Sequence, residues 1–150
     1  MNSRGLDFAA IPINKLLGLE LRSSSREGAT VALPSRESLT QEYAVIHGGI
    51  LATLADTAAV YALHPFLEAG ERMASVEFKV NFLSPATSAG GEVVARSTVI
   101  RRGRSIAVAQ VEVRQADQLV LTGLFTYIML GAERDDAGVM KHRRLRRPGS

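Results

Sequence analysis

The sequence predicts an α+β fold in which a curved antiparallel sheet wraps around one long helix. The helix is indicated by the segment from Val45 to His64, which is rich in Ala and Leu and holds one acidic residue, Asp56, and no Lys or Arg. A helix that is apolar on nearly every side must be covered on nearly every side. The sheet is indicated by short segments on both sides of the helix that alternate apolar and polar residues with the period of a β-strand.

The chain before the helix is expected to form a lead-in and a first hairpin. Asp7–Leu17 is typical of a short helical segment, with Pro12 near its start. Strands are expected at Leu19–Arg22 and Ala29–Leu33, joined by a turn of small and charged residues that ends in glycine. A polar connection, Pro34–Val45, follows, and connections of this length often contain functional residues.

The central helix is expected from about Gly49 to His64, because Pro65 disfavours its continuation. The clearest strand comes next, at Met73–Leu83, where four apolar residues alternate with polar ones, so that one face should be buried. The alternating apolar residues are Val76, Phe78, Val80 and Phe82.

Three more strands are expected after that, joined by short turns at Arg102–Gly103 and Ala116–Gln118. They span Glu92–Ile100, Arg104–Gln115 and Leu119–Leu130. Short connections favour antiparallel neighbours, so the last four strands are expected to form a meander. One helix cannot cover the whole sheet and its edges remain open, and dimerisation would answer both problems.

Length and composition predict one domain, residues 1–132, followed by a basic and flexible tail, residues 133–150. The first 132 residues contain twelve basic and twelve acidic residues, so the tail supplies the whole net charge of +3. A nucleic-acid-binding domain should have a basic face in its body, and none is indicated. The tail could contact an anionic surface, although a solvated, partly disordered chain end is the simpler explanation.

The absence of cysteine excludes disulfides, thiolate catalysis and Cys-ligated metal centres. Three histidines without cysteine give little support for any metal site. No segment is typical of a signal peptide or of a membrane-spanning helix, so a cytoplasmic protein without membrane contact is expected.

Three motifs resemble one known family. His47-Gly48-Gly49 opens the helix, Asp56 follows nine residues after the histidine within the segment LADTA, and the strand VEFKVNFLSPA occupies 76–86. Together they resemble the hotdog-fold thioesterases, most closely the PaaI-type branch of the 4-hydroxybenzoyl-CoA thioesterase superfamily, over Leu16–Leu130. The resemblance implies hydrolysis of acyl-CoA thioesters without a cofactor. It also implies homodimers with active sites between subunits, often paired into homotetramers.

The resemblance also implies roles for individual residues. Asp56 would be the general base or the nucleophile, and burial would make its carboxylate a better base than one in water. The Gly48 N–H, at the positive end of the helix dipole, would polarise the thioester carbonyl. Gln41 matches a position that is often Asn in relatives and would bind the water or the carbonyl, and Ser75 would assist Asp56. His47 is expected to orient the glycine turn rather than to transfer protons.

Several alternatives stay open at the level of sequence. Asp56 could belong to a solvated stripe on one face of the helix together with Thr53, Thr57 and His64, which follow Gly49 at helical spacing. If the helix instead forms an active site, Gly49 would let the substrate approach the backbone closely. Three arginines at a hairpin suit the phosphates of CoA, but they also suit an ordinary charged hairpin tip. They are Arg101, Arg102 and Arg104.

Two other functions compete with hydrolysis. The first is a hydratase or dehydratase on the same fold, which would use a histidine with an acid, and His47 is committed to the glycine turn. The second is a non-catalytic module that binds acyl-CoA.

Overall fold

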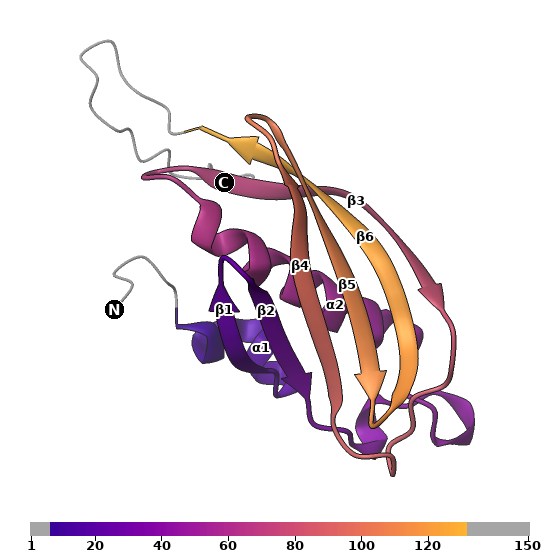
Figure 1. Cartoon of the computed structure of the whole chain (residues 1–150). Helices are drawn as coiled ribbons and strands as arrows, with labels where there is room; N and C mark the ends of the chain where they lie inside the picture. The colour runs from indigo at the N-terminus through magenta and orange to yellow at the C-terminus, as the bar shows by residue number, and fades with distance from the viewer. Residues whose placement is uncertain (1–6, 132–150) are drawn as a thin grey trace, which may run out of the picture.

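The computed structural model describes residues 7–131 and contains one six-stranded sheet that curves around one long helix (Figure 1). The helices are α1 (Pro12–Leu17) and α2 (Gly48–Leu63), with short 3-10 turns η1 (Phe8–Ala10), η2 (Glu37–Leu39), η3 (Glu42–Ala44) and η4 (His64–Phe66). The strands are β1 (Glu20–Ser25), β2 (Gly28–Leu33), β3 (Arg72–Phe82), β4 (Val93–Arg102), β5 (Ile106–Gln115) and β6 (Gln118–Leu130). This confirms the predicted fold class and element order. The predicted tail, 133–150, lies outside the described residues.

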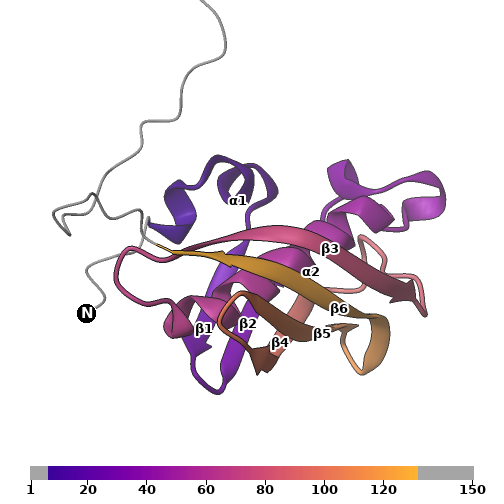
Figure 2. The same ribbon diagram turned by 90° about the horizontal axis from the view of Figure 1, so that it is seen from above.

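α2 lies inside the curve of the sheet (Figure 2) and packs mainly against β2, β4 and β5. Its buried side chains are Leu and Ala: Leu51, Leu54, Ala55, Ala58, Ala59, Ala62 and Leu63. They meet the inward-facing Val and Ala residues of the three strands, such as Val31, Ala95 and Val111. The small alanines let the helix approach the sheet closely, so one helix and one sheet share a single core.

The order of the strands corrects one prediction. The order across the sheet is β1-β2-β4-β5-β6-β3, and all neighbours are antiparallel. β3 therefore does not precede β4 in a meander but lies at the far edge, beside β6 (Figure 1). The connection between β3 and β4, residues 83–92, is long enough to cross the end of the sheet. Two backbone hydrogen bonds hold this connection in place. The Leu83 N–H donates to the Val120 carbonyl, and the Ile46 N–H donates to the Ala86 carbonyl.

The prediction that one face of β3 is buried is also wrong for the single chain. Most of its residues are exposed, and Phe78 and Phe82 keep 49% and 55% of their surface accessible. The reason is position, because α2 packs mainly on strands that lie farther across the sheet. A register shift between Ser75 and Glu77 also removes Val76 from the regular alternation.

The turns of two hairpins differ from the sequence prediction, one in length and one in position. β1 continues to Ser25, because the backbones of Ser24 and Ser25 pair with β2 whatever the side chains are. β4 continues through Arg102 and β5 begins only at Ile106, so this turn occupies residues 103–105 and lies farther along the chain than predicted.

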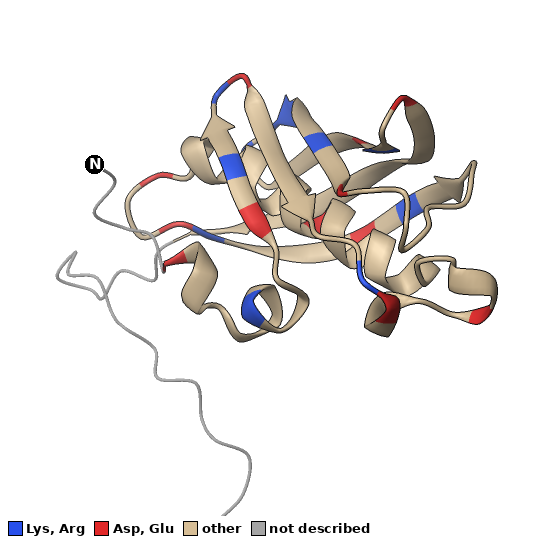
Figure 3. Ribbon diagram, turned by 90° about the horizontal axis from the view of Figure 1, so that it is seen from below, with Lys and Arg blue, Asp and Glu red and all other residues tan. Residues whose placement is uncertain are grey.

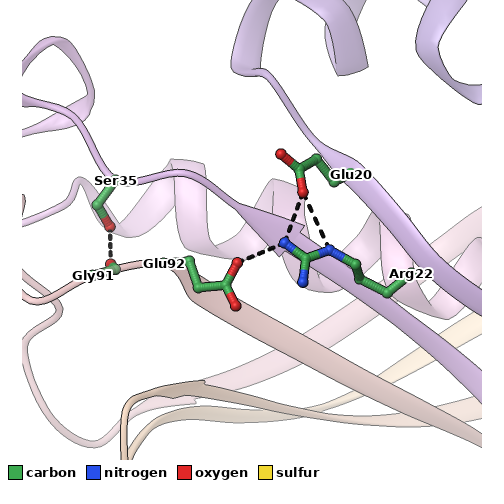
Figure 4. A network of polar contacts seen from close by, with 5 residues as sticks. All are labelled: Glu20, Arg22, Ser35, Gly91 and Glu92. Atoms are coloured by element: carbon green, nitrogen blue, oxygen red, sulfur yellow. Dashed lines mark hydrogen bonds and ion pairs between the residues drawn. The ribbon is translucent and has the colours of Figure 1, made fainter.

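Side chains of β1 and of the loop after β2 are tied to the segment just before β4 (Figure 4). The Arg22 guanidinium contacts both Glu20 and Glu92 at 2.7 Å, and the Ser35 hydroxyl donates to the Gly91 carbonyl at 2.5 Å. Elsewhere, basic and acidic residues are interspersed over strands and loops (Figure 3). Among the helices of residues 7–131, none is long and apolar enough to cross a membrane.

Candidate active site

The N-terminus of α2 has one backbone N–H group that is available to a ligand. The His47 side chain caps the helix, because its Nδ1 accepts the Gly49 N–H at 2.9 Å. The Gly48 N–H has no acceptor among residues 7–131. Since this group lies at the positive end of the helix dipole, it is suited to stabilise negative charge on a carbonyl oxygen.

The loop before this helix places Gln41 near the same end. The Gln41 N–H bonds the Val45 carbonyl at 2.8 Å, which closes a tight loop around η3. Two consecutive non-glycine residues inside it, Tyr43 and Ala44, adopt left-handed φ angles of 59° and 57°. Such angles cost energy and often occur at functional sites. The Gln41 side chain is exposed and has no hydrogen-bond partner within the described part of the chain.

Asp56 lies in the middle of α2 and is held by a residue of the sheet. The Tyr127 hydroxyl donates to Oδ1 of Asp56 at 2.6 Å. Tyr127 is 1% exposed. Burial, reinforced by the hydrogen bond and the charge of Asp56, raises the pKa of Tyr127 far above its ordinary value. The phenol therefore stays protonated and donates, while Oδ2 of Asp56 has no partner within residues 7–131.

Ser75 is the third member of this cluster. It lies directly opposite Tyr127 in the pairing of β3 with β6. Side chains opposite one another lie on the same face of a sheet, about 5 Å apart at Cβ. Ser75 is exposed, so Asp56, Tyr127 and Ser75 form a polar group that opens to solvent at the uncovered edge of the sheet.

The two groups of candidate residues are separated along α2. Asp56 is eight residues after Gly48, which corresponds to about 12 Å along a helix axis. One carbonyl group cannot contact the Gly48 N–H and lie beside Asp56 of the same chain. The fold thus brings His47, Gly48 and Gln41 together at one end of the helix, and Asp56 with Ser75 at its middle.

The residues of the helix stripe that competed with catalysis are half-buried, and Asp56 differs from the two threonines among them. Thr53 and Thr57 donate to the helix carbonyls of Gly49 and Thr53, at 2.9 and 2.8 Å. Their hydroxyls are therefore satisfied inside the helix. Of these three polar residues, only Asp56 receives a hydrogen bond from the sheet.

The arginines at the β4–β5 hairpin have different environments. Arg102 pairs with Glu71 at 2.6 Å, and the two side chains keep 18% and 13% of their surface. Burial raises the pKa of Glu71, but the Glu68 N–H and the Arg102 guanidinium outweigh it, and the net pKa is lowered. Arg101 and Arg104 are exposed and belong to no ion pair among the described residues.

A pocket of about 470 Å³ lies beside this hairpin. It is lined by Arg26, Phe66, Leu67, Glu68, Glu71, Arg102, Gly103 and Arg104. The Arg26 guanidinium lies over the Phe66 ring, 5.0 Å from its centre. The pocket therefore includes two of the three arginines that the sequence singled out, and it adds Arg26 from the turn between β1 and β2.

Tyr127 is the polar residue of the site that sequence reasoning missed. Phe125, Tyr127 and Met129 alternate along β6 and are all buried, as expected for an ordinary core strand. This pattern predicts that Tyr127 points inward. Nothing in the sequence indicates that its hydroxyl meets a carboxylate 71 residues away.

Comparisons with known proteins identify the family of the chain. The family model of the Thioesterase superfamily matches residues 43–122. The medium/long-chain acyl-CoA thioesterase YigI of Salmonella typhimurium is 29% identical over 136 residues, which cover 81% of this chain and 86% of that protein. Mouse acyl-coenzyme A thioesterase 13 is 29% identical over 108 residues, covering 71% and 76% of the two chains.

Solved structures give the same result. The crystal structure of a thioesterase from Haemophilus influenzae superposes with a TM-score of 0.76 at 27% identity, covering 82% of this chain and 85% of that one. The match to the family model spans more than half of the chain and includes the helix with Gly48 and Asp56. The chain therefore belongs to the thioesterase superfamily and has its hotdog fold.

Proposed function

We propose that this protein hydrolyses acyl-CoA thioesters to a free acid and CoA. The main support is the Asp56 carboxylate, which is anchored through Oδ1 by a buried phenol and whose Oδ2, beside an open edge of the sheet, has no partner among residues 7–131. The similarity to YigI, an enzyme named for medium- and long-chain acyl-CoAs, makes these esters the first substrates to examine. The PaaI-type branch remains the proposed subgroup.

In the proposed reaction, Oδ2 of Asp56 takes a proton from water, and the water oxygen attacks the thioester carbon. The negative charge that develops on the carbonyl oxygen is stabilised by the Gly48 N–H. The C–S bond then breaks, and the CoA thiolate takes the proton from Asp56. In the nucleophilic variant, the carboxylate attacks the thioester carbon, the C–S bond breaks and CoA thiolate leaves. Water then cleaves the resulting anhydride to the free acid and Asp56, and the thiolate takes the proton released. Gln41 binds the water or the carbonyl, Ser75 assists Asp56, and His47 holds the glycine turn.

We further propose that each active site forms between two copies of the chain. The 12 Å estimated between Gly48 and Asp56 supports this, because a second copy can supply the missing partner to each. The edge strand β3 is the proposed contact. It is eleven residues long and exposes Phe78 and Phe82, whereas the other edge, β1, has six mostly polar residues. Long apolar edges favour pairing with another strand.

Further pairing of dimers into a tetramer is part of the same proposal. Ile106 and Ile128 are paired across β5 and β6, and both are exposed on the sheet face away from α2. Leu124 extends this apolar area along β6. Exposed apolar areas of this kind mark contact surfaces.

The arginines near the hairpin are proposed to bind the phosphates of CoA. Arg104 and Arg101 are exposed and free of ion pairs within residues 7–131, so their guanidinium groups are available to a phosphate. Arg102 would act with them while remaining paired with Glu71. Gly49, at the start of α2, would allow close approach of the pantetheine arm.

The reaction is tested by free-thiol release from short, medium, long and aryl acyl-CoAs, with wild type beside Asp56→Asn. Release by the wild type and its loss in the variant support the proposal. Hydration of an enoyl-CoA without thiol release would instead identify a hydratase. Binding of acyl-CoA in calorimetry without turnover of any ester would identify a binding module.

The shared site is tested by mixing two inactive variants. Proline is tolerated at the first position of a helix, and His47 has the extended backbone that precedes proline, so Gly48→Pro removes one N–H with little disturbance. Gly48→Ala is the matched control, because it keeps the N–H and adds a Cβ 3.2 Å from the exposed Phe82 ring. We expect Gly48→Pro to lose about 10²- to 10³-fold in kcat.

When Asp56→Asn and Gly48→Pro subunits are co-expressed, mixed dimers should contain one intact site and regain activity. Recovery in the purified mixed dimer supports a site shared between subunits. No recovery in a mixed dimer of confirmed composition would mean that both groups act within one chain.

A further inference from the structure

We propose that Tyr127 is the positioning residue of Asp56: its buried hydroxyl fixes the orientation of the carboxylate and leaves one defined oxygen, Oδ2, for chemistry. This inference rests on the proposed function. It concerns a residue of β6 that belongs to none of the sequence motifs described above.

The environment of the hydroxyl supports this role. Tyr127 lies in a row of buried residues on β6 whose neighbours, Phe125 and Met129, are apolar. A buried hydroxyl is costly unless it is hydrogen-bonded, and phenylalanine would fill the same space without that cost. Within residues 7–131, the acceptors that the hydroxyl reaches both belong to Asp56: Oδ1 at 2.6 Å and the backbone carbonyl at 3.3 Å. The hydroxyl is therefore explained by Asp56 alone.

The geometry also defines which oxygen can react. A phenol has one proton to donate, and the shorter contact directs it to Oδ1. A side chain held at one carboxylate oxygen cannot rotate freely about its Cα–Cβ bond, so Oδ2 keeps a constant position. Fixed placement of a reacting group contributes strongly to rate, and small displacements are costly.

The donor is neutral, which distinguishes this contact from an ion pair. A hydrogen bond from a phenol stabilises the ionised carboxylate without neutralising its charge. No Lys, Arg or His within residues 7–131 forms an ion pair with Asp56. Other titratable groups of α2 lie toward its ends, at His47, Tyr61 and His64.

The charged residues of the strands around Asp56 lie elsewhere. On β3, β4 and β5 they alternate with the residues that face α2 and point to the opposite face of the sheet, or they lie at the hairpin end. The first group is Arg72, Glu77, Lys79, Arg96, Glu112 and Arg114, and the second is Glu71, Arg101 and Arg102. Tyr127 is therefore the titratable side chain in direct contact with Asp56.

The test compares Tyr127→Phe with Tyr61→Phe, which removes a hydroxyl from the C-terminal part of α2 and leaves Asp56 untouched. We expect Tyr127→Phe to lower kcat about 10- to 100-fold with little change in KM. The acid limb of its pH–rate profile should move to higher pH, because the ionised carboxylate loses a stabilising hydrogen bond. Tyr61→Phe should match the wild type in all three measurements, and circular dichroism confirms the fold of both variants.

A kcat and pH profile in Tyr127→Phe equal to those of Tyr61→Phe would overturn the inference. The proposed function would still stand if Asp56→Asn were inactive in the same assay. A loss of kcat without a change in the pH profile would also overturn it, since a purely structural defect would have that effect.

A second measurement does not depend on activity. Carboxyl ¹³C chemical shifts of the aspartates are followed by NMR as a function of pH, and the Asp56 signal is identified by its absence in Asp56→Asn. In Tyr127→Phe the midpoint of this titration should move to higher pH than in the wild type. An unchanged midpoint would overturn the inference even if no ester were hydrolysed by the wild type.

Discussion

Asp56 and Glu71 are two acidic residues on the helix side of the same sheet, and their surroundings are opposite. Both Glu71 carboxylate oxygens accept from the Arg102 guanidinium at 2.6 Å, and one also accepts the Glu68 N–H at 3.0 Å. Asp56 accepts one hydrogen bond from a neutral phenol, and its second oxygen has no partner within residues 7–131.

The difference separates a structural carboxylate from a reactive one. A carboxylate that is charge-paired and fully hydrogen-bonded has no free lone pair directed at a ligand, so it links β3 to the β4–β5 hairpin. A carboxylate held at one oxygen by a neutral donor keeps its charge and a free oxygen. Hydrogen-bond satisfaction, more than burial, therefore identifies the candidate base in this protein.

The largest expected effect is on activity. Asp56→Asn should reduce kcat about 10²- to 10⁴-fold, the usual contribution of a general base. Its free energy of unfolding should change little, because the asparagine oxygen can still accept from Tyr127. Glu71→Gln is the matched control and should keep most of the wild-type kcat. Steady-state kinetics and urea unfolding of both variants measure these effects, and equal losses of kcat would remove the distinction between the two carboxylates.

The second effect is on stability, and here Glu71, not Asp56, is the carboxylate whose replacement matters. Glu71→Gln should lower the free energy of unfolding by about 1–3 kcal/mol at pH 7, because it removes a largely buried, charge-assisted contact. The folded-state pKa of Glu71 lies below its ordinary value of 4.5. The stabilisation is therefore fully present above the ordinary pKa of 4.5 and is lost as the pH falls through the lower folded-state pKa.

Urea unfolding of wild type and Glu71→Gln from pH 7 down to pH 3.5 checks this pH dependence. The difference between the two proteins should become smaller toward the acid end. A difference that is constant across the range would show that ionisation of Glu71 does not contribute to it.

The smallest expected effect is on KM and compares two arginines of one hairpin. Arg104→Ala should raise KM for acyl-CoA about 3- to 10-fold, because one phosphate contact is lost while the reacting groups stay in place. KM for an acyl-N-acetylcysteamine thioester, which lacks the phosphates, should not change. Arg114→Ala, at the opposite end of β5, serves as the control. An equal rise in KM for both substrates would exclude phosphate binding by Arg104.

The elements of the fold were predictable where a local pattern is strong. The run of Ala and Leu after Gly48 predicts a buried helix, and α2 begins and ends within one residue of the expected bounds. Alternation likewise predicts β3 and β6 almost to the residue. The place of β3 in the sheet was not predictable, because periodicity describes one strand and contains no information on its neighbour.

The candidate site also combines features that follow from the local sequence with contacts that only the fold creates. The nine-residue spacing from His47 to Asp56 follows from the chain itself, and helix geometry then separates Gly48 from Asp56 by about 12 Å. The contact of Asp56 with Tyr127 joins residues 71 apart and exists only because β6 passes beside α2. The pairing of Arg102 with Glu71, 31 residues apart, is equally a product of the fold.

By itself, the sequence determined the fold class, the central helix and its acid, and the glycine turn that opens it, because these depend on residues close together in the chain. Only the tertiary structure decided that β3 is an exposed edge, that Glu71 forms an ion pair with Arg102 and that Asp56 is held by Tyr127. Those outcomes depend on contacts between distant segments, whose geometry arises when the sheet closes around α2.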